Sequence, residues 1–345
     1  ILSGLVGSEM CIRDRPTALH PEHLTREEYN ANRLCRQQSS GELAGKYPMK
    51  QHFSLSLFLI LLFVLTGCNL PAVKPITTLQ AILTPTATFV VPTATPTLQP
   101  TVTKKPVCHE MSGKVESHEL VDLRLDKPIR YLVYIPPCYD FSTNKDRKYP
   151  VLYLLHGQNS DEEQWLRIGV VKEADNAIWS KELPPFVMVF PFDYSIKQPN
   201  QYPYEDVFME KLVPEVDQNY RILPGRSNHA IGGLSRGGAW ALHLGIRNPQ
   251  VFGIIGGHSP VIFYADHANL PASLLKLSAA EMPRIWLDIG NSDSELRLMR
   301  QFEQFLTNNQ IPHTWNVFEG YHEEKYWSAH VAEYLAWYAG QWSGR

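Results

Sequence analysis

Hydrophobic runs of strand length alternate with amphipathic segments of helix length through the C-terminal part of the chain. Continuous apolar runs bounded by proline or glycine, such as residues 149–157, are typical of buried parallel strands. This pattern predicts strands at 129–137, 149–157, 185–193, 228–235, 251–259, 284–293 and 313–322. Apolar residues at the helical period predict helices at 205–220, 236–248, 295–309 and 326–342. Pro214 should bend the first helix or divide it.

The alternation predicts an α/β fold with a mostly parallel central sheet and helices on both faces. Sheets of this kind place their functional sites at the carboxyl ends of the strands. The segment between His258 and Arg284 is short, so we expect an open pocket without a large lid.

Residues 1–67 lack the pattern of a folded core. The opening of residues 1–48 resembles translated sequencing-adapter sequence, and we interpret this leader as non-native, with a disordered extension as the alternative. Residues 49–67 combine a basic start with a short apolar run, which fits a lipoprotein-type signal peptide. The Leu-Thr-Gly-Cys ending resembles a bacterial lipobox and implies lipid attachment at Cys68. An ordinary membrane anchor or a non-lipidated signal is the alternative.

Threonine and proline dominate residues 68–106, which cannot bury enough apolar surface to offset the entropy of ordering. We predict a disordered tether here, followed by one domain over 107–345. Of the five cysteines, two fall in the leader and one in the lipobox. Cys108 and Cys138 remain, and outside the cytosol we expect them to form a disulfide, two free thiols being the alternative.

Composition adds mainly exclusions. The chain is 44% hydrophobic with a formal net charge of -3, so nothing in it favours nucleic-acid binding. No cluster of histidine, cysteine and acidic residues has metal-ligand spacing, and we expect neither a metal nor another cofactor. Membrane contact is expected through the lipid anchor only.

A glycine-rich stretch carries the first candidate for chemistry. The pattern Gly-Leu-Ser-Arg-Gly at 233–237 follows an apolar strand and opens a helix, as in a nucleophile elbow. Glycines are needed there because the strand and helix backbones nearly touch, and the turn holds the Ser235 hydroxyl outward. By itself this short motif is weakly specific, and it needs partners to carry a functional conclusion.

A serine nucleophile needs a base, and the base needs an acid that holds it in the right tautomer. His322 ends the last predicted strand, and Asp293 follows the strand before it. Asp288 and Glu295 are the alternative acids. The order Ser235, Asp293, His322 matches that of α/β-hydrolases. For the oxyanion we expect the Arg236 N–H, with Gln158 as the second donor and Gly157 as its alternative.

Motifs in the right order over about residues 115–342 resemble the “Putative esterase” family of the α/β-hydrolase superfamily. They are YLVYIPPCYD, YPVLYLLHGQ, LVPEVDQNYRI, AIGGLSRGGAWAL, LDIGNSD and FEGYHEEKYW. Relatives in that family include enterochelin, feruloyl and acetylxylan esterases, S-formylglutathione hydrolases and mycolyltransferases. The resemblance implies that Ser235, Asp293 and His322 form the catalytic triad. It also implies that Trp165 and Trp327 approach the pocket rim.

Three further positions bear on the expected site, and two of them depart from the family pattern. His258 follows a strand in the sequence Gly-Gly-His-Ser-Pro, and we expect it beside the pocket, where with the two tryptophans it would contact substrate. Cys138 stands where relatives commonly have glycine, which favours the disulfide and loosens the analogy around that loop. Arg236 replaces the commoner methionine, with little expected effect because its side chain should point away from the oxyanion.

These observations predict a serine carboxylic-ester hydrolase that works outside the cytoplasm, tethered to a bacterial cell envelope, through an acyl-enzyme. Its substrate would be a small-molecule or glycan-linked ester. An envelope acyltransferase using the same triad, or a non-catalytic surface binding module with the same fold, are the alternatives.

Overall fold

The computed structural model describes residues 106–343. The predicted leader, signal peptide and tether, together with the lipidation site at Cys68, lie outside the described residues. Within the described part of the chain, no helix has the length and apolar run that a bilayer crossing requires.

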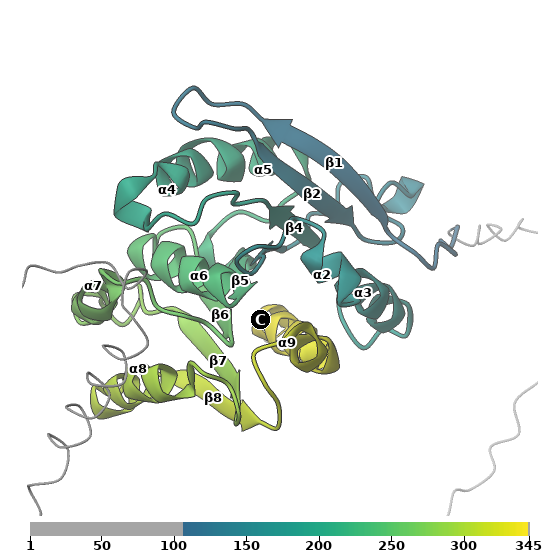
Figure 1. Cartoon of the computed structure of the whole chain (residues 1–345). Helices are drawn as coiled ribbons and strands as arrows, with labels where there is room; N and C mark the ends of the chain where they lie inside the picture. Colours follow the sequence, from purple (N-terminus) through teal and green to yellow (C-terminus); the bar gives the residue numbers. More distant parts are fainter. Residues whose placement is uncertain (1–105, 344–345) are drawn as a thin grey trace, which may run out of the picture. The chain divides into compact units, whose positions relative to one another are not determined.

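One eight-stranded sheet organises the described residues, in the order β1-β2-β4-β3-β5-β6-β7-β8 (Figure 1). The pairs from β4 through β3 to β8 are parallel, whereas β2 runs antiparallel to both β1 and β4. The strands are β1 Lys114–Leu120, β2 Ile129–Ile135, β3 Val151–Leu155, β4 Val187–Pro191, β5 His229–Leu234, β6 Ile254–His258, β7 Arg284–Gly290 and β8 His313–Phe318. The predicted mostly parallel α/β sheet is confirmed, with two antiparallel strands at one edge.

Helices cover both faces of the sheet and form two hydrophobic cores. One face carries α2 Gln164–Arg167, α3 Val170–Trp179 and α9 Glu324–Ser343 (Figure 1). The other carries α4 Tyr204–Val207, α5 Val213–Asn219, α6 Arg236–Arg247, α7 Asp266–Leu274 and α8 Leu296–Asn308. Side chains of β3 alternate between the two cores, with Tyr153 in one and Leu152 in the other. Single 3-10 turns occur at Ser142–Asn144, Pro199–Gln201 and Arg226–Asn228.

The predicted helix over 205–220 is divided at its proline. A π-helical turn, Phe208–Leu212, separates α4 from α5, and Pro214 lies in the first turn of α5. Proline has no N–H to donate and its ring clashes with a carbonyl in the preceding turn, so a widened turn accommodates it. The expectation that Pro214 bends or divides the helix is confirmed.

Elements without a counterpart among the sequence predictions include β1, α3 and α7. Strand β1 is exposed along most of its length and pairs only with β2, so it lacks the apolar run that marks the inner strands. Helix α3 buries only a narrow stripe, and α7 contains Pro271 in its interior. The segment between β6 and β7 is thus partly helical.

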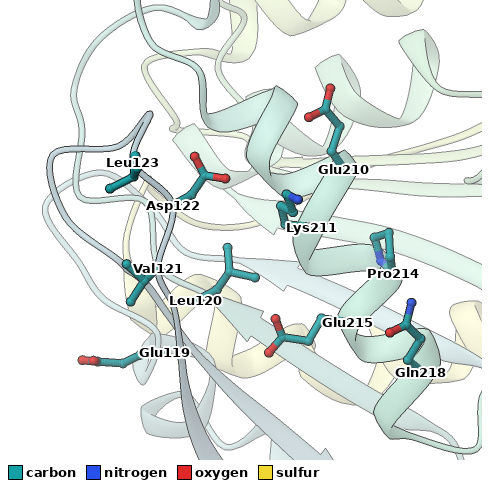
Figure 2. A pocket seen from close by; sticks show the side chains of 10 residues that line it. All are labelled: Glu119, Leu120, Val121, Asp122, Leu123, Glu210, Lys211, Pro214, Glu215 and Gln218. Atoms are coloured by element: carbon teal, nitrogen blue, oxygen red, sulfur yellow. The ribbon is translucent and has the colours of Figure 1, made fainter.

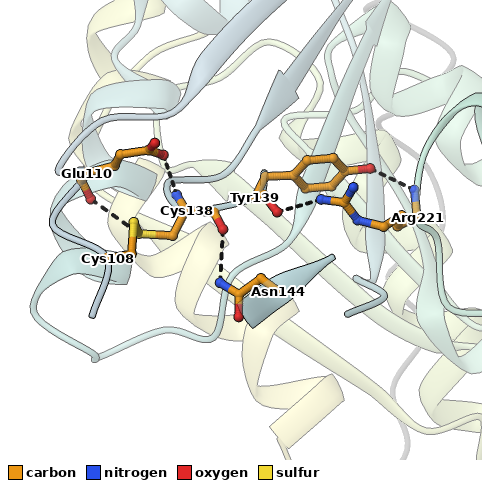
Figure 3. Close-up of a disulfide and its surroundings, with 6 residues drawn as sticks. All are labelled: Cys108, Glu110, Cys138, Tyr139, Asn144 and Arg221. Atoms are coloured by element: carbon orange, nitrogen blue, oxygen red, sulfur yellow. Dashed lines mark hydrogen bonds between the residues drawn. A yellow bond between two sulfur atoms is a disulfide. The ribbon is translucent and has the colours of Figure 1, made fainter. Parts of the chain in front are cut away.

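The predicted disulfide joins Cys108 to Cys138 and fastens the start of the domain to the loop after β2 (Figure 3). The Cys138 N–H donates to Glu110, and the Cys138 carbonyl accepts from Asn144. Cys138 has φ 63°, a left-handed conformation that favours glycine. This explains why relatives commonly have glycine there, and it means that the cysteine is held in a mildly strained backbone.

We expect the disulfide to stabilise the domain by about 3–4 kcal/mol, because it closes a loop across a sequence separation of 30 residues. Urea unfolding should show this difference between the wild type and the Cys108→Ser/Cys138→Ser variant. The Cys108→Ser/Cys138→Gly variant should recover about 1 kcal/mol, since glycine relieves the left-handed strain. Equal unfolding midpoints for the wild type and both variants would contradict the expectation. As a control, reductant should lower the unfolding midpoint of the wild type only.

Candidate active site

Ser235 occupies the tight turn between β5 and α6. Its backbone has φ 52° and ψ -115°, a strained conformation for a residue with a side chain. A Cβ atom on Gly233 would lie 2.2 Å from backbone atoms of Gly237, and one on Gly237 would lie 2.2 Å from the Leu155 carbonyl oxygen. Strand, turn and neighbouring strand thus approach so closely that only glycine fits at these two positions, as the sequence pattern indicated.

Three loops bring the predicted serine, histidine and aspartate together. The Ser235 Oγ lies 2.8 Å from the His322 Nε2, and the His322 Nδ1 lies 2.8 Å from the Asp293 Oδ2. An ionised carboxylate only accepts hydrogen bonds, so the Nδ1 carries the proton and the Nε2 accepts from the serine hydroxyl. The residues come from the β5–α6 turn, the β7–α8 loop and the β8–α9 loop, which share the carboxyl edge of the parallel sheet.

Asp293 is held ionised by its hydrogen bonds. Burial raises the pKa of its carboxyl, but hydrogen bonds from His322 and from the Glu295 N–H, at 2.8 Å each, outweigh burial and lower the pKa below its ordinary value. Of the three acids considered from the sequence, Asp293 is the one that contacts His322. Glu295 lies at the start of α8, and Asp288 faces elsewhere.

Asp288 lies in a separate buried network under the sheet edge. Its Oδ1 lies 2.6 Å from the His258 Nδ1 and accepts from the Trp286 indole, while its Oδ2 accepts from Tyr326 and Tyr334. The His258 side chain is fully buried, so the expectation that it lies beside the pocket is wrong. It fails because the pleat of β6 turns that ring toward α9. The His258 carbonyl nevertheless accepts the Ser235 N–H at 3.1 Å and steadies the elbow.

The two tryptophans assigned to the pocket rim are both buried. Trp165 is 1% exposed and donates its indole N–H to the Leu155 carbonyl in the core under α2. Trp327 is 5% exposed and packs at right angles to the His322 ring, with ring centroids 5.3 Å apart. The rim assignment is therefore wrong for Trp165. Trp327 borders the base rather than an open surface, and apolar burial explains both positions.

Exposed large side chains occur instead on three loops that follow strands at the carboxyl edge. Ile196, Tyr264 and Tyr321 follow β4, β6 and β8 and are each more than half exposed. The Tyr264 N–H donates to the Gln198 side chain, which joins two of these loops. Sequence patterns gave no sign of these three residues, because loop side chains have no periodicity to read.

For the predicted oxyanion donors, the structure separates the two alternatives. Helix α6 begins at Arg236. The Arg236 guanidinium turns away from Ser235 and forms a buried ion pair with Asp193 at 3.0 Å. The Gly157 N–H donates to the Gln164 side chain at 2.7 Å, so Gly157 is not free to serve as a donor. That leaves the Arg236 and Gln158 N–H groups as the predicted pair.

The peptide that carries the Gln158 N–H is held in one orientation. The Asp193 N–H donates to the His156 Nε2, so the proton of this ring lies on the Nδ1, which is 2.7 Å from the Gly157 carbonyl. Burial lowers the pKa of His156, in keeping with a neutral ring. The Ser160 N–H also donates to that carbonyl. In a trans peptide the Gln158 N–H points the opposite way from this carbonyl, away from His156.

A hollow of about 690 Å³ lies away from these residues, between the end of β1 and α5 (Figure 2). Acidic side chains line much of it, but Asp122 and Glu210 are paired with Arg124, and Glu215 accepts from Tyr131. No candidate catalytic residue lines this hollow, and we place the candidate active site at the elbow.

Comparisons with known proteins identify the family. The sequence profile of a family described as “Putative esterase” matches residues 123–338. An endo-1,4-beta-xylanase/feruloyl esterase of Xylanibacter ruminicola is 32% identical over 135 residues, which are 36% of this chain and 18% of that protein. This chain thus matches only about a fifth of that relative's length.

Solved structures share the fold. A ferulic acid esterase superposes with a TM-score of 0.60 at 24% identity, over 67% of this chain and 99% of the other. One from Anaeromyces mucronatus, in complex with ferulic acid, gives 0.57 at 20% identity, over 70% and 95%. An S-formylglutathione hydrolase from Staphylococcus aureus gives 0.54 at 17% identity, over 66% and 99%. At these identities the likeness shows an α/β-hydrolase fold.

Proposed function

This chain belongs to the “Putative esterase” family, and we propose that it is an ester hydrolase that acts through Ser235, His322 and Asp293 by way of an acyl-enzyme. The observation that carries the proposal is the unbroken chain of hydrogen bonds from the Ser235 hydroxyl through His322 to Asp293, each 2.8 Å long. The His322 side chain is 27% exposed, so substrate can reach the Ser235–His322 end of this row of hydrogen bonds.

In the proposed mechanism the Ser235 Oγ attacks the ester carbonyl carbon while the His322 Nε2 takes the hydroxyl proton. The carbonyl oxygen becomes an oxyanion, and the Arg236 and Gln158 N–H groups stabilise it. Collapse of this intermediate breaks the bond to the alcohol, which leaves with the proton from His322. Water then attacks the acyl-serine carbonyl and gives one proton to the same nitrogen. Collapse of this second intermediate breaks the bond to the Ser235 Oγ, which takes that proton back from His322 as the carboxylic acid leaves.

For the substrate we propose esters of aromatic carboxylic acids carried on glycans. Three of the similar proteins are named as ferulic or feruloyl esterases. The exposed Tyr264 and Tyr321 offer rings for stacking on an aromatic acid. The purified domain should be tested with methyl ferulate, a feruloylated oligosaccharide, an acetylated xylan and p-nitrophenyl acetate. Preference for the feruloyl esters supports the proposal, and preference for the acetyl esters contradicts it. Transfer of the acyl group to an added sugar, without net hydrolysis, would identify an acyltransferase instead.

We also propose that the domain works outside the cytoplasm, anchored by lipid on Cys68. The disulfide between Cys108 and Cys138 supports an oxidising compartment. In a bacterial host, the Cys68→Ala variant of the full chain should move from the membrane fraction to the soluble extracytoplasmic fraction, because the acyl chains that hold it are lost. Its rate of ester hydrolysis per molecule should not change. Equal membrane retention of the wild type and the variant would contradict lipidation.

A further inference from the structure

Gln164 forms a buried bridge between two loops of the site. The oxyanion loop, residues 157–160, follows β3, and the base loop, residues 319–323, connects β8 to α9. The Gln164 Oε1 accepts the Gly157 N–H at 2.7 Å, and its Nε2 donates to the Glu324 carboxylate at 3.0 Å. One side-chain amide therefore joins backbone next to the nucleophile to the residue that follows the base loop, 160 positions away in sequence.

The bridge has a fixed direction. Glu324 lies in the first turn of α9 and forms an ion pair with Arg167 at 3.7 Å. A carboxylate accepts only, so the Gln164 NH₂ must face Glu324 and its carbonyl must face Gly157. Gln164 is 4% exposed, so leaving either end of its side-chain amide without a hydrogen bond would be unfavourable.

Both ends of the bridge lie close to reacting groups. A Cβ built on Gly157 would be 3.6 Å from the Ser235 Cβ, so a small movement of the oxyanion loop would displace the Gln158 N–H. Glu324 comes two residues after His322. Packing alone does not require an amide here, because a leucine of similar size would fill the same volume without either hydrogen bond.

We propose that Gln164 is a positioning residue that holds the Gln158 N–H in place for the oxyanion and couples that loop to the base loop through Glu324. This inference rests on the proposed function, since it concerns the same ester hydrolysis. It adds a residue that touches no reacting atom and acts through Gly157 and Glu324.

The test compares Gln164→Leu with the wild type in steady-state hydrolysis and in binding of phenylboronic acid, a mimic of the tetrahedral intermediate. A misplaced donor weakens the transition state more than the bound ester, so kcat should fall by about 10- to 100-fold while KM stays within about twofold. Affinity for the boronic acid should fall by about the same factor as kcat. If Gln164 had only a structural role, Gln164→Leu would lower thermal stability. It would not lower kcat and boronic acid affinity together while KM stays unchanged.

A second pair of variants keeps the test decisive if Gln164→Leu does not fold. Glu324 is half exposed, so its substitution should be tolerated. Glu324→Ala should lower kcat and boronic acid affinity together, and Glu324→Gln, which keeps an acceptor for the Gln164 NH₂, should recover most of both. The proposal is overturned if folded Gln164→Leu has wild-type kcat, or if Glu324→Ala and Glu324→Gln are equally active. If the wild type itself hydrolyses no ester, the proposed function fails instead.

Discussion

The Ser235→Ala variant is expected to lose about four to six orders of magnitude in kcat for ester hydrolysis while remaining folded. The substitution removes one oxygen from a turn whose shape depends on Gly233 and Gly237, so the backbone of the elbow should be unchanged. Without that oxygen no acyl-enzyme can form, and His322 has only water to activate. Initial rates with the best ester from the substrate panel, at matched protein concentration, measure the loss.

Covalent labelling separates a nucleophile from a bystander serine. A fluorophosphonate should modify the wild type at Ser235 and leave Ser235→Ala unlabelled. Ser180→Ala is the matched control, because the Ser180 hydroxyl only donates to the Ala177 carbonyl at the end of α3. This control should keep both the wild-type rate and the label. Substantial hydrolysis by Ser235→Ala, or labelling of another residue, would rule out the proposed mechanism.

Asp293→Asn is expected to lower kcat by about 10⁴-fold, because it reverses the tautomer of His322. The Glu295 N–H donates to the Asp293 Oδ1, so an asparagine would keep its carbonyl oxygen on that side. Its NH₂ group would then face the His322 Nδ1, which would have to accept. The proton would move to the Nε2, which could no longer take the proton from Ser235. Steady-state kinetics at neutral pH measure the effect.

Asp288→Asn provides the control for an acid in a buried site. Asp288 accepts four hydrogen bonds in the network around His258, so its substitution should destabilise the domain by about 3 kcal/mol. Its effect on kcat should be far smaller than that of Asp293→Asn, measured at a temperature where both variants are folded. A larger loss of kcat from Asp288→Asn would transfer the role of acid to that residue.

Much of the fold could be read from local patterns. Inner strands such as β3 and β4 are apolar along their whole length because both faces are covered, and that property is visible in the sequence. Strand β1 could not be found this way, since it is mostly exposed and is held by hydrogen bonds to β2. The pairing of Cys108 with Cys138 followed from their number and the compartment, and the structure contains it.

In the candidate site, too, some features follow from local sequence and others depend on tertiary packing. The elbow is readable because glycines two positions either side of a serine are required by local crowding, and Asp293 and His322 follow strands whose ends meet at one edge. Their catalytic roles stay predictions until the variants are measured. The expectations that Trp165 approaches the pocket rim and that His258 lies beside the pocket failed, because burial depends on which side of the sheet a ring faces and what packs there.

By itself, the sequence determined the order of strands β2 to β8 along the chain, the glycine-lined turn around Ser235 and the few residues able to act with it, because backbone sterics and hydrophobic periodicity operate between near neighbours. Only the tertiary structure decided that the Gly157 N–H is occupied, which leaves Gln158 as the predicted second donor, and that Gln164 spans to Glu324. Those outcomes are hydrogen bonds between segments distant in sequence, and no local pattern encodes which partner a buried amide will meet.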